Sequence, residues 1–370
     1  MNSNSLNMLA VGDIILGPDA EAFFTYVKPV LDAGDVLVGQ LEVPYTKRDP
    51  EAVSLGRDPD NLQALVSAGF DVVTLAGNHI WDAGVQGIED TMAWLKKHGI
   101  AFTGAGMNIE EARLPVIIDC EGTRFGFLNY NCVGPKEMWA SRDKAGCAYV
   151  HIITHYELEY ATPGGPPAIY TWAEPDSLGQ MVEDISRLRP LCDILVVSLH
   201  KGLVHMPVKL AAYEHQVSYA AIDAGADLVV GQHAHILKGI ELYKGKAIFH
   251  GLCNLVAFLP SLVPKPGQDP KSWAARRREI FGFEPDPEYP TYPFHPEAKY
   301  TIIAKCKIKD KKISQVSYIP CLVNKQGQPE VMKRDARGEK VFEYMEKITR
   351  DAGLNAEFDW QEDEIVVKGS

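Results

Sequence analysis

The sequence predicts an α/β fold, in which helices cover a sheet of parallel strands and a second, mainly antiparallel sheet packs against the first. Three observations support this prediction. A plan of Ala-Gly, Asp, an apolar run and a polar residue occurs at 32–42, 67–79 and 223–235. Segments with apolar residues at helical spacing precede these strands. After residue 235 the pattern changes to alternating strands.

The parallel strands each end in a polar residue. The chain opens with a related strand, "MLAVGD" at 8–13, and "LCDILVVSLH" at 191–200 lacks Ala-Gly but ends in the same way. In sheets with helices on both faces, ligands bind outside the carboxyl ends of the strands. We therefore expect one edge of the sheet to carry Asp13, Glu42, Asn78, His79, His200, His233 and His235.

The remaining elements follow from the same periodicities. Helices are expected at 61–69, 87–99, 177–190 and 213–225, each closed by Gly or Pro. A hairpin is expected at 238–252 around Lys244-Gly245, with further strands in 299–323. The tail, "EKVFEYMEKITRDAG" and then "EIVVKG", predicts a final helix and strand.

Two Pro- and Gly-rich stretches, 133–176 and 258–298, interrupt this plan. Long loops without clear periodicity are usually functional lids or linkers, and the aromatic residues in these two favour packed lids. We interpret residues 1–370 as a single catalytic domain with two lid insertions.

Composition excludes several classes of partner. The net charge is -12, from 49 acidic and 37 basic residues, so a nucleic-acid surface is not expected. The basic run "ARRRE" at 275–279 is interpreted as a solvated helix face.

The N-terminus has neither a signal peptide nor a membrane-spanning stretch, which predicts a cytoplasmic protein without membrane contact. Seven scattered cysteines, without a C-x-x-C pair, predict reduced core thiols.

The polar residues at the strand ends predict a metal site. They combine carboxylates and imidazoles without a thiolate, a set that suits manganese, zinc or iron better than a structural zinc cage. His233 and His235 are two residues apart, so both would face one site if the extended geometry persisted past Gly231. Taken singly, Asp13 or Asn78 is equally well explained as a turn former or a helix cap.

The motifs "GNH" at 77–79, "SLH" at 198–200 and "GQHAH" at 231–235 resemble those of the calcineurin-like metallophosphoesterase superfamily. More specifically, "VGDIILG", "GQLE", "TLAGNHIWDAG", "VSLHKG", "GADLVVGQHAHILKGIE" and "FHGLCNLV" resemble the CapA family of capsule and poly-γ-glutamate biosynthesis proteins. The resemblance spans roughly residues 8–257. It implies a four-layer α/β/β/α sandwich.

The resemblance also implies roles for the residues at matched positions. Asp13 and His235 would hold one metal ion, while Asn78, His200 and His233 would hold a second. Glu42 stands where a carboxylate bridges the two ions. His79, beside Asn78, would be the acid or base, with Asp13 as a further candidate.

The sequence departs from the superfamily pattern in one place that bears on the metal. The usual Asp-x-His is absent, because Asp13 is followed by Ile14 and Ile15, so the first ion loses a ligand. We therefore expect one or two divalent ions, with the first site weak, empty or filled only with substrate.

Three further residues are candidates for contacts with the substrate, and a fourth is a candidate for proton transfer. Lys201 would bind a substrate carboxylate or cap a loop, and His205 would line the pocket or lie on a surface loop. Asn254, in "FHGLCNLV", is assigned to substrate binding. His295, in "YPFHPE", lies in the second lid and is a third candidate acid or base.

Three functions from different classes follow. The first is a metal-dependent hydrolase or epimerase, acting on a small-molecule or peptide substrate with carboxylate and amide groups. The second is a phosphoesterase, which the missing Asp-x-His and the absence of Arg near the motifs weaken. The third is a noncatalytic accessory factor in poly-γ-glutamate or capsule synthesis. The sequence does not predict an oligomeric state.

Overall fold

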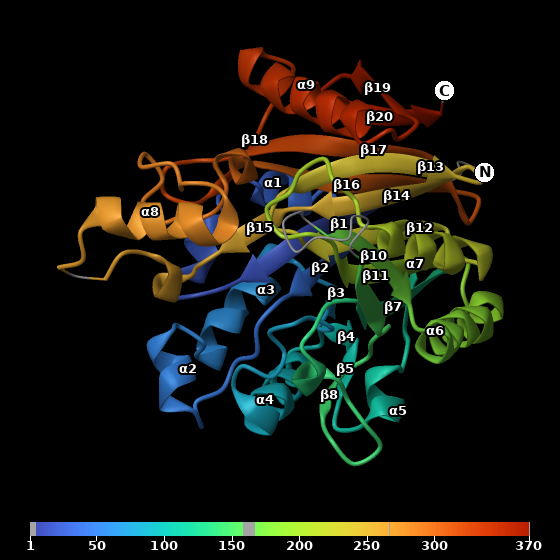
Figure 1. Cartoon of the computed structure of the whole chain (residues 1–370). Helices are drawn as coiled ribbons and strands as arrows, with labels where there is room; N and C mark the ends of the chain where they lie inside the picture. The colour runs from blue at the N-terminus through green and yellow to red at the C-terminus, as the bar shows by residue number, and fades with distance from the viewer. Residues whose placement is uncertain (1–4, 158–166, 266, 370) are drawn as a thin grey trace.

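The computed structural model describes residues 5–157, 167–265 and 267–369, and two large sheets form its centre (Figure 1). The first is ten-stranded, and β1, β2, β3 and β4 are parallel neighbours in it. Its strands are β1 (Leu6–Ile15), β2 (Val36–Leu41), β3 (Val72–Thr74), β4 (Ala101–Thr103), β15 (Asn254–Ala257), β16 (Tyr300–Lys309), β17 (Lys312–Val323), β18 (Pro329–Val331), β19 (Ala356–Gln361) and β20 (Glu364–Gly369).

The second sheet is six-stranded, in the order β13-β14-β12-β11-β7-β6. Its strands are β6 (Val116–Cys120), β7 (Thr123–Asn131), β11 (Ile194–Lys201), β12 (Leu228–His233), β13 (Leu237–Tyr243) and β14 (Lys246–Leu252). The strands β7, β11, β12 and β14 are parallel, and β13 pairs with β14 as the expected hairpin.

Helices lie outside both sheets. They are α1 (Lys28–Leu31), α2 (Pro50–Ser54), α3 (Gln63–Ala68), α4 (Gly84–Lys97), α5 (Ile109–Ala112), α6 (Pro175–Leu188), α7 (Ala212–Asp223), α8 (Pro270–Phe281) and α9 (Ala336–Asp351). Single 3-10 turns are η1 (Ala20–Phe24), η2 (Pro59–Leu62), η3 (Lys136–Met138), η4 (Arg189–Leu191), η5 (Pro260–Leu262) and η6 (Pro296–Lys299). The helices predicted from periodicity correspond to α3, α4, α6, α7 and α9, so that part of the prediction is confirmed.

Alternation along the strands divides the apolar residues between two cores. In β11, Ile194 and Val196 point inward and join a core shared with the ten-stranded sheet. Leu195 and Val197 point outward and pack with α6 and α7 in a second core. The helices α3 and α4 cover the other sheet, so the predicted four-layer α/β/β/α sandwich is confirmed.

The expectation that one sheet carries all the polar strand ends is wrong. The strands β1, β2 and β3 lie in the ten-stranded sheet, whereas β11 and β12 lie in the six-stranded sheet. The expected separate antiparallel sheet is likewise absent from the described residues, because its strands join the edges of these two sheets. Strands of both sheets are buried on both faces, so the apolar runs carry no signal of which sheet each one joins.

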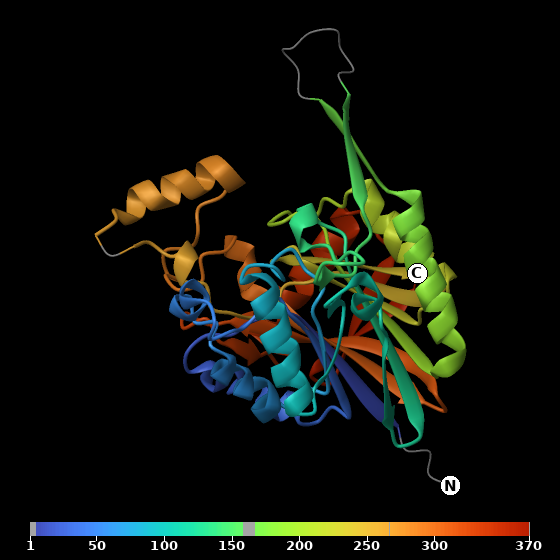
Figure 2. The same ribbon diagram turned by 90° about the horizontal axis from the view of Figure 1, so that it is seen from below.

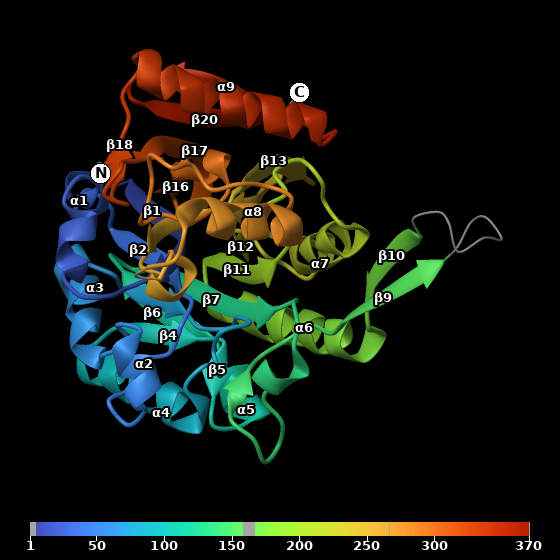
Figure 3. The ribbon, with the colours of Figure 1, turned by 60° about the vertical axis from the view of Figure 1, so that its left-hand side comes forward.

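The two Pro- and Gly-rich stretches differ in their position. Between 133 and 176, β9 (Ile152–Glu157) and β10 (Ala168–Ala173) form a ribbon that stands out from the body (Figures 2 and 3), with β8 (Gly146–Cys147) paired to β5 (Ala105–Gly106) near its base. Residues 158–166 fall outside the described part of the chain. The stretch 258–298 contains α8 and three buried aromatic residues, Phe283, Tyr292 and Phe294.

The structure also bears on the predictions about membrane-spanning segments and about the cysteines. Within the described residues, no helix combines the length and apolarity needed to cross a bilayer. All seven cysteines are free thiols, and every one except the half-buried Cys120 is buried, which agrees with their interpretation as reduced core thiols.

The close approach of β1 to the start of β15 generates a prediction about stability. A Cβ atom on Gly12 would lie 1.8 Å from the carbonyl oxygen of Cys253, which is backbone and cannot move aside. We expect Gly12→Ala to lower the free energy of unfolding in urea by about 3 kcal/mol or more. The control, Gly179→Ala in α6, has no atom within 4 Å of its new Cβ. It should raise stability by roughly 0.5–1 kcal/mol, and equal effects of the two changes would contradict the prediction.

Candidate metal centre

The two sheets deliver polar side chains to a common place because their inner faces pack together. Asp13 lies in β1, and Glu42 directly follows β2. His200 lies in β11, and His233 is the last residue of β12. The parallel strands of both sheets therefore place these side chains around one point inside the sandwich, rather than along the edge of one sheet.

Asp13, Glu42 and His235 form the first group. Their ligand atoms all lie within 4.8 Å of one another. His235 Nδ1 is 3.7 Å from Asp13 Oδ2, and His235 Nε2 is 3.3 Å from Glu42 Oε1. Both carboxylates are 0% exposed. This group has the composition and spacing of a divalent cation site.

Asn78, His200 and His233 form the second group. The Asn78 Oδ1 atom is 2.7 Å from His200 Nε2 and 3.1 Å from His233 Nδ1. The other ring nitrogen of His200, Nδ1, is 3.9 Å from Asp13 Oδ1, which links the two groups. The structure thus brings together the metal-ligating residues predicted from the sequence, in the two sets that the family resemblance implies.

The residues fit a metal because several buried donor atoms lack a partner. Asp13 Oδ1, both carboxylate oxygens of Glu42 and His200 Nδ1 form no hydrogen bond within the described residues. Burying a carboxylate oxygen without a hydrogen bond costs several kcal/mol unless an opposite charge satisfies it. A divalent cation bound here would satisfy these atoms together.

Burial and charge set the protonation of the first group. Burial raises the pKa of Asp13 well above its ordinary value, and the neighbouring Glu42 carboxylate raises it further. Burial alone would lower the pKa of His235, but the carboxylates of Glu42 and Asp13 outweigh it and raise that pKa to about 9. The His235 imidazolium in turn lowers the pKa of Glu42, although burial acts in the opposite direction.

The second group is neutral. Burial lowers the pKa of His200 well below its ordinary value, and it lowers the pKa of His233 to about 3. Both imidazoles therefore keep a free lone pair, which is the form that binds metal ions.

The turn after β12 separates its two histidines. His233 and His235 have positive φ angles of 88° and 51°, so the extended geometry does not continue to His235. The backbone N–H of His233 donates to Asp13 Oδ2 at 2.9 Å. The imidazole of His233 thus faces Asn78, while that of His235 faces Glu42.

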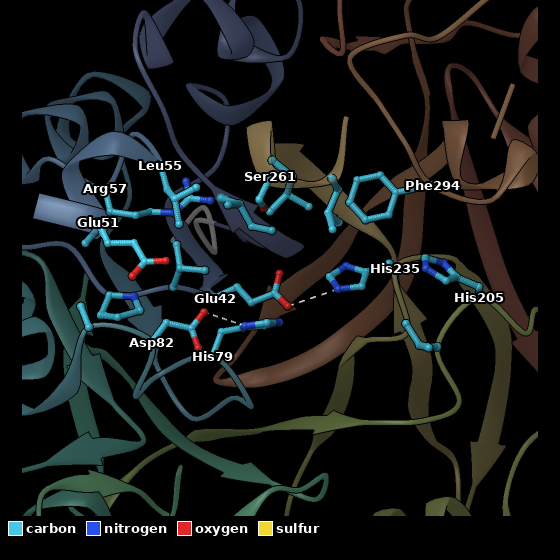
Figure 4. A pocket seen from close by; sticks show the side chains of 18 of the residues that line it. Glu42, Glu51, Leu55, Arg57, His79, Asp82, His205, His235, Ser261 and Phe294 are labelled. Carbon is cyan, nitrogen blue, oxygen red and sulfur yellow. Dashed lines mark hydrogen bonds and ion pairs between the residues drawn. The ribbon is translucent and has the colours of Figure 1, made fainter. Parts of the chain in front are cut away.

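A cavity of about 490 Å³ opens beside the first group (Figure 4). Glu42, His79 and His235 line it together with residues of the 258–298 stretch. The His79 Nδ1 atom lies 2.8 Å from a carboxylate oxygen of Asp82. Burial opposes a charge on His79, but Asp82 and Glu42 raise its pKa above the ordinary value. The His79–Asp82 pair thus lies at the edge of the candidate metal centre.

Two of the candidate substrate contacts lie close to His235. His205 lines the cavity, and its ring lies 6.1 Å from the His235 ring and 4.8 Å from the Phe283 ring, centroid to centroid. Asn254 is buried, accepts a hydrogen bond from His235 Nδ1 at 2.8 Å and donates one to the Tyr292 hydroxyl at 3.0 Å. Asn254 therefore orients His235.

Lys201 and His295 lie elsewhere. Lys201 follows His200 in β11, so alternation points it to the outer face, where it is 0% exposed and contacts Glu214 at 3.4 Å and His250 at 2.9 Å. His295 precedes η6, and its Nδ1 accepts the N–H of Glu297 at 3.1 Å. Neither residue belongs to the lining of the cavity.

A third group of side chains, outside the candidate metal centre, also has metal-like spacing but a different explanation. His215, Glu241 and His250 also lie within 4.8 Å of one another. However, the Glu241 carboxylate contacts both imidazoles, at 3.2 and 3.0 Å, and also accepts from the Tyr219 hydroxyl. These hydrogen bonds already satisfy the group, so it requires no cation.

Sequence reasoning missed several residues of the cavity, among them Glu51, Arg57, Asp82 and Arg277. The two arginines matter because we inferred that no Arg lies near the motifs. The run "ARRRE" does lie on a helix, α8, but one of its members, Arg277, is buried at 8% exposed. The position of this run inside a predicted lid, 258–298, was the sequence signal that could have indicated an arginine in the cavity.

Several known proteins are similar to this chain. The family model described as "Bacterial capsule synthesis protein PGA_cap" matches residues 7–258. The chain is 30% identical over 261 residues to the PGA biosynthesis protein CapA of Bacillus subtilis, covering 66% of this chain and 62% of that protein. It is 32% identical over 232 residues to a probable polyglutamine synthesis accessory protein of Mycobacterium tuberculosis, covering 60% and 56%.

The chain thus spans about three fifths of the length of these relatives. Among solved structures, the calcineurin-like phosphoesterase YfkN of Bacillus subtilis superimposes with a TM-score of 0.42 and 13% identity, covering 95% of this chain and 98% of that one.

The unpartnered carboxylates generate a prediction about metal binding. Manganese at a hundredfold excess over its Kd should raise the free energy of unfolding by about 2.7 kcal/mol relative to protein in EDTA. Asp13→Asn should abolish this increment, because it removes a ligand charge while its amide oxygen still accepts the N–H of His233.

The matched control is His215→Ala, which disrupts the hydrogen-bonded cluster of His215, Glu241 and His250, outside the candidate metal centre. Its increment with manganese, measured by the same urea titrations, should equal that of the unmodified protein. A full increment in Asp13→Asn would contradict this site.

Proposed function

Because the chain belongs to the bacterial capsule synthesis protein family PGA_cap, we propose that it is a metal-dependent enzyme acting on an amide bond of a peptide-like substrate. Cleavage of that bond is the reaction we favour. One observation carries this proposal: buried donor atoms of Asp13, Glu42 and His200 lack hydrogen bonds, and Glu42 lines the cavity that contains the His79–Asp82 pair.

The donor set fits one or two divalent ions. Asp13, Glu42 and His235 would hold one, and Asn78, His200 and His233 the other. A bound ion would supply a Lewis acid for the substrate carbonyl. Asn254 holds the His235 ring in place through its 2.8 Å hydrogen bond, in the way that an outer partner orients a ligating imidazole.

In this proposal, His79 donates a proton. Its Nδ1 contacts Asp82, so Nε2 is the atom free to serve the substrate. The raised pKa of His79, held up by Asp82 and Glu42 against the effect of burial, favours the protonated ring. An amine leaves an amide only when it is protonated, which is the task of a general acid. A protonated His79, supported by Asp82, therefore favours amide cleavage.

The cavity suits part of a peptide. It combines apolar walls from Leu55, Leu262 and Phe294 with the charged side chains of Glu51 and Arg57. Such a mixture of apolar surface with a few placed polar groups is usual for substrate pockets. The names of the relatives, PGA biosynthesis and polyglutamine synthesis, direct the first choice of test substrate toward glutamyl peptides.

A noncatalytic role is the second candidate, because one relative is described as an accessory protein of polyglutamine synthesis. A metal centre that only stabilises the fold would serve such a role. The phosphoesterase alternative has less support, since Glu42, Glu51 and Asp82 all line the cavity and would repel a dianionic phosphate.

Activity toward γ-linked oligoglutamate tests the proposal. Manganese-loaded protein should release shorter peptides in deuterated water, as followed by mass spectrometry. His79→Ala should lower kcat by about 10²–10⁴-fold, the usual loss when a general acid is removed, with metal binding retained. His215→Ala, outside the cavity, should retain full activity.

Other outcomes identify the alternatives. Deuterium at an α-carbon without cleavage indicates epimerisation by removal and return of the α-proton. Manganese-dependent turnover of bis-p-nitrophenyl phosphate indicates a phosphoesterase. Stoichiometric manganese without reaction on any of these substrates contradicts catalysis and favours the accessory role.

A further inference from the structure

Arg277 extends from α8 into the cavity beside the candidate metal centre. The residue is 8% exposed and is one of those that line the cavity. The plane of its guanidinium group is supported by the Phe281 ring, whose centroid lies 4.6 Å from Cζ. Its Nη2 donates to the carbonyl oxygen of Pro293 at 2.9 Å. These contacts fix the position of the cation.

The charge of Arg277 is not balanced by any acidic side chain of the described residues. No ion pair joins it to a carboxylate there, and its buried Nε has no hydrogen-bond partner in that part of the chain. Burial without a counter-charge lowers the pKa of Arg277. A buried cation with unused donors is costly in the absence of a ligand.

The other arginine of the cavity differs from Arg277 in this respect. Arg57 donates from Nη1 to the carbonyl oxygen of Leu16 at 2.6 Å and from Nη2 to that of Phe258 at 3.0 Å. Both of its terminal nitrogens thus serve the backbone and hold β1 to the 258–298 stretch. Among the described residues of the lining, Arg277 is the guanidinium whose two terminal nitrogens are not both used, because only its Nη2 donates to the backbone.

Arg277 is connected to the metal centre through the aromatic wall of the cavity. Its supporting ring, Phe281, lies 5.6 Å from the His205 ring, and the His205 ring lies 6.1 Å from that of His235. Arg277, His205 and His235 line one cavity, so a substrate that filled the space from Arg277 to His205 would approach the proposed metal ligands. Glu51 and Asp82 belong to the same lining.

We propose that Arg277 binds a carboxylate of the substrate and thereby selects an acidic peptide. The inference rests on the proposed function, because it takes this cavity as the substrate site. The planar guanidinium fork matches the two oxygens of a carboxylate. A single negative charge also matches a single unbalanced cation, whereas a phosphate dianion would face Glu42, Glu51 and Asp82 in excess.

Binding, rather than turnover, tests this assignment. The probes are γ-linked triglutamate and the same peptide with its carboxylates converted to carboxamides, titrated by calorimetry into protein in EDTA and into manganese-loaded protein. The unmodified protein should prefer the acidic peptide by about tenfold or more, the usual value of hydrogen bonds to a charged group. Arg277→Gln should reduce that preference to about unity without weakening the carboxamide peptide, and Arg277→Lys should retain part of it.

The matched control is Arg276→Gln. Arg276 is the neighbouring residue of α8 and is exposed, so this change removes the same charge without touching the cavity and should leave the preference intact. The proposal is overturned if Arg277→Gln keeps the preference, if both peptides weaken equally in that variant, if the unmodified protein binds neither peptide, or if inorganic phosphate displaces the acidic peptide more effectively than acetate does.

The two proposals fail separately. An Arg277-dependent preference in protein that never cleaves or epimerises a peptide would remove the proposed enzyme activity and keep the carboxylate site. Turnover of oligoglutamate with an unchanged preference in Arg277→Gln would do the reverse.

Discussion

The rest of the structure depends on two buried carboxylates that keep oxygen atoms without hydrogen bonds. Asp13 lies in β1, Glu42 directly follows the neighbouring strand β2, and both are fully buried. In a medium of low dielectric constant, two such groups repel each other and lose their hydration. His235 brings a positive charge to them. The His233 N–H holds Asp13, and Asn254 holds His235, so these hydrogen bonds keep the two carboxylates and the imidazole together.

The strands that carry these side chains are held together by very close contacts between their backbones. Gly12 and Gly231 leave no room for a side chain, because a Cβ atom would lie 1.8 Å from the Cys253 oxygen and 2.2 Å from the His250 oxygen. This close packing brings β1 against the start of β15 and β12 against β14. The left-handed residues after β12 then direct His233 and His235 to different partners. Rigid strands position the carboxylates, and a short strained turn positions the imidazoles.

The 258–298 stretch gives the centre its outer wall. Phe281, Phe283 and Phe294 surround His205, and Phe294 also contacts His235. This apolar cover lowers the pKa of His205 to about 2, chiefly through burial, so that ring stays neutral. On the other side of the cavity, the carboxylate of Asp82 favours a charged His79. The pKa values of these two imidazoles are thus shifted in opposite directions, because one ring lies among phenylalanines and the other beside a carboxylate.

Much of this protein could be predicted from the sequence. The apolar runs, helical periodicities and Gly-Pro boundaries predicted the individual strands and helices, because burial of one face of a strand or helix imposes a periodic pattern on the sequence. The four layers were implied by the resemblance to a known family. The residues Asp13, Glu42, Asn78, His200, His233 and His235 were evident as polar ends of strands, and the structure brings them together. The roles of these residues in metal binding stay predictions.

Only the tertiary structure decided how the two sheets share the site and which side chains surround it. Apolar strands look alike in either sheet, so the sequence placed all the ligands in one. Lys201 follows a proposed ligand, yet strand alternation points it to the opposite face. Arg277 stands in a run of exposed charges and is nevertheless buried in the cavity wall. A sequence records which residues are polar and how often they recur, whereas the direction and the partners of a side chain depend on segments far away in the chain, which only packing brings together.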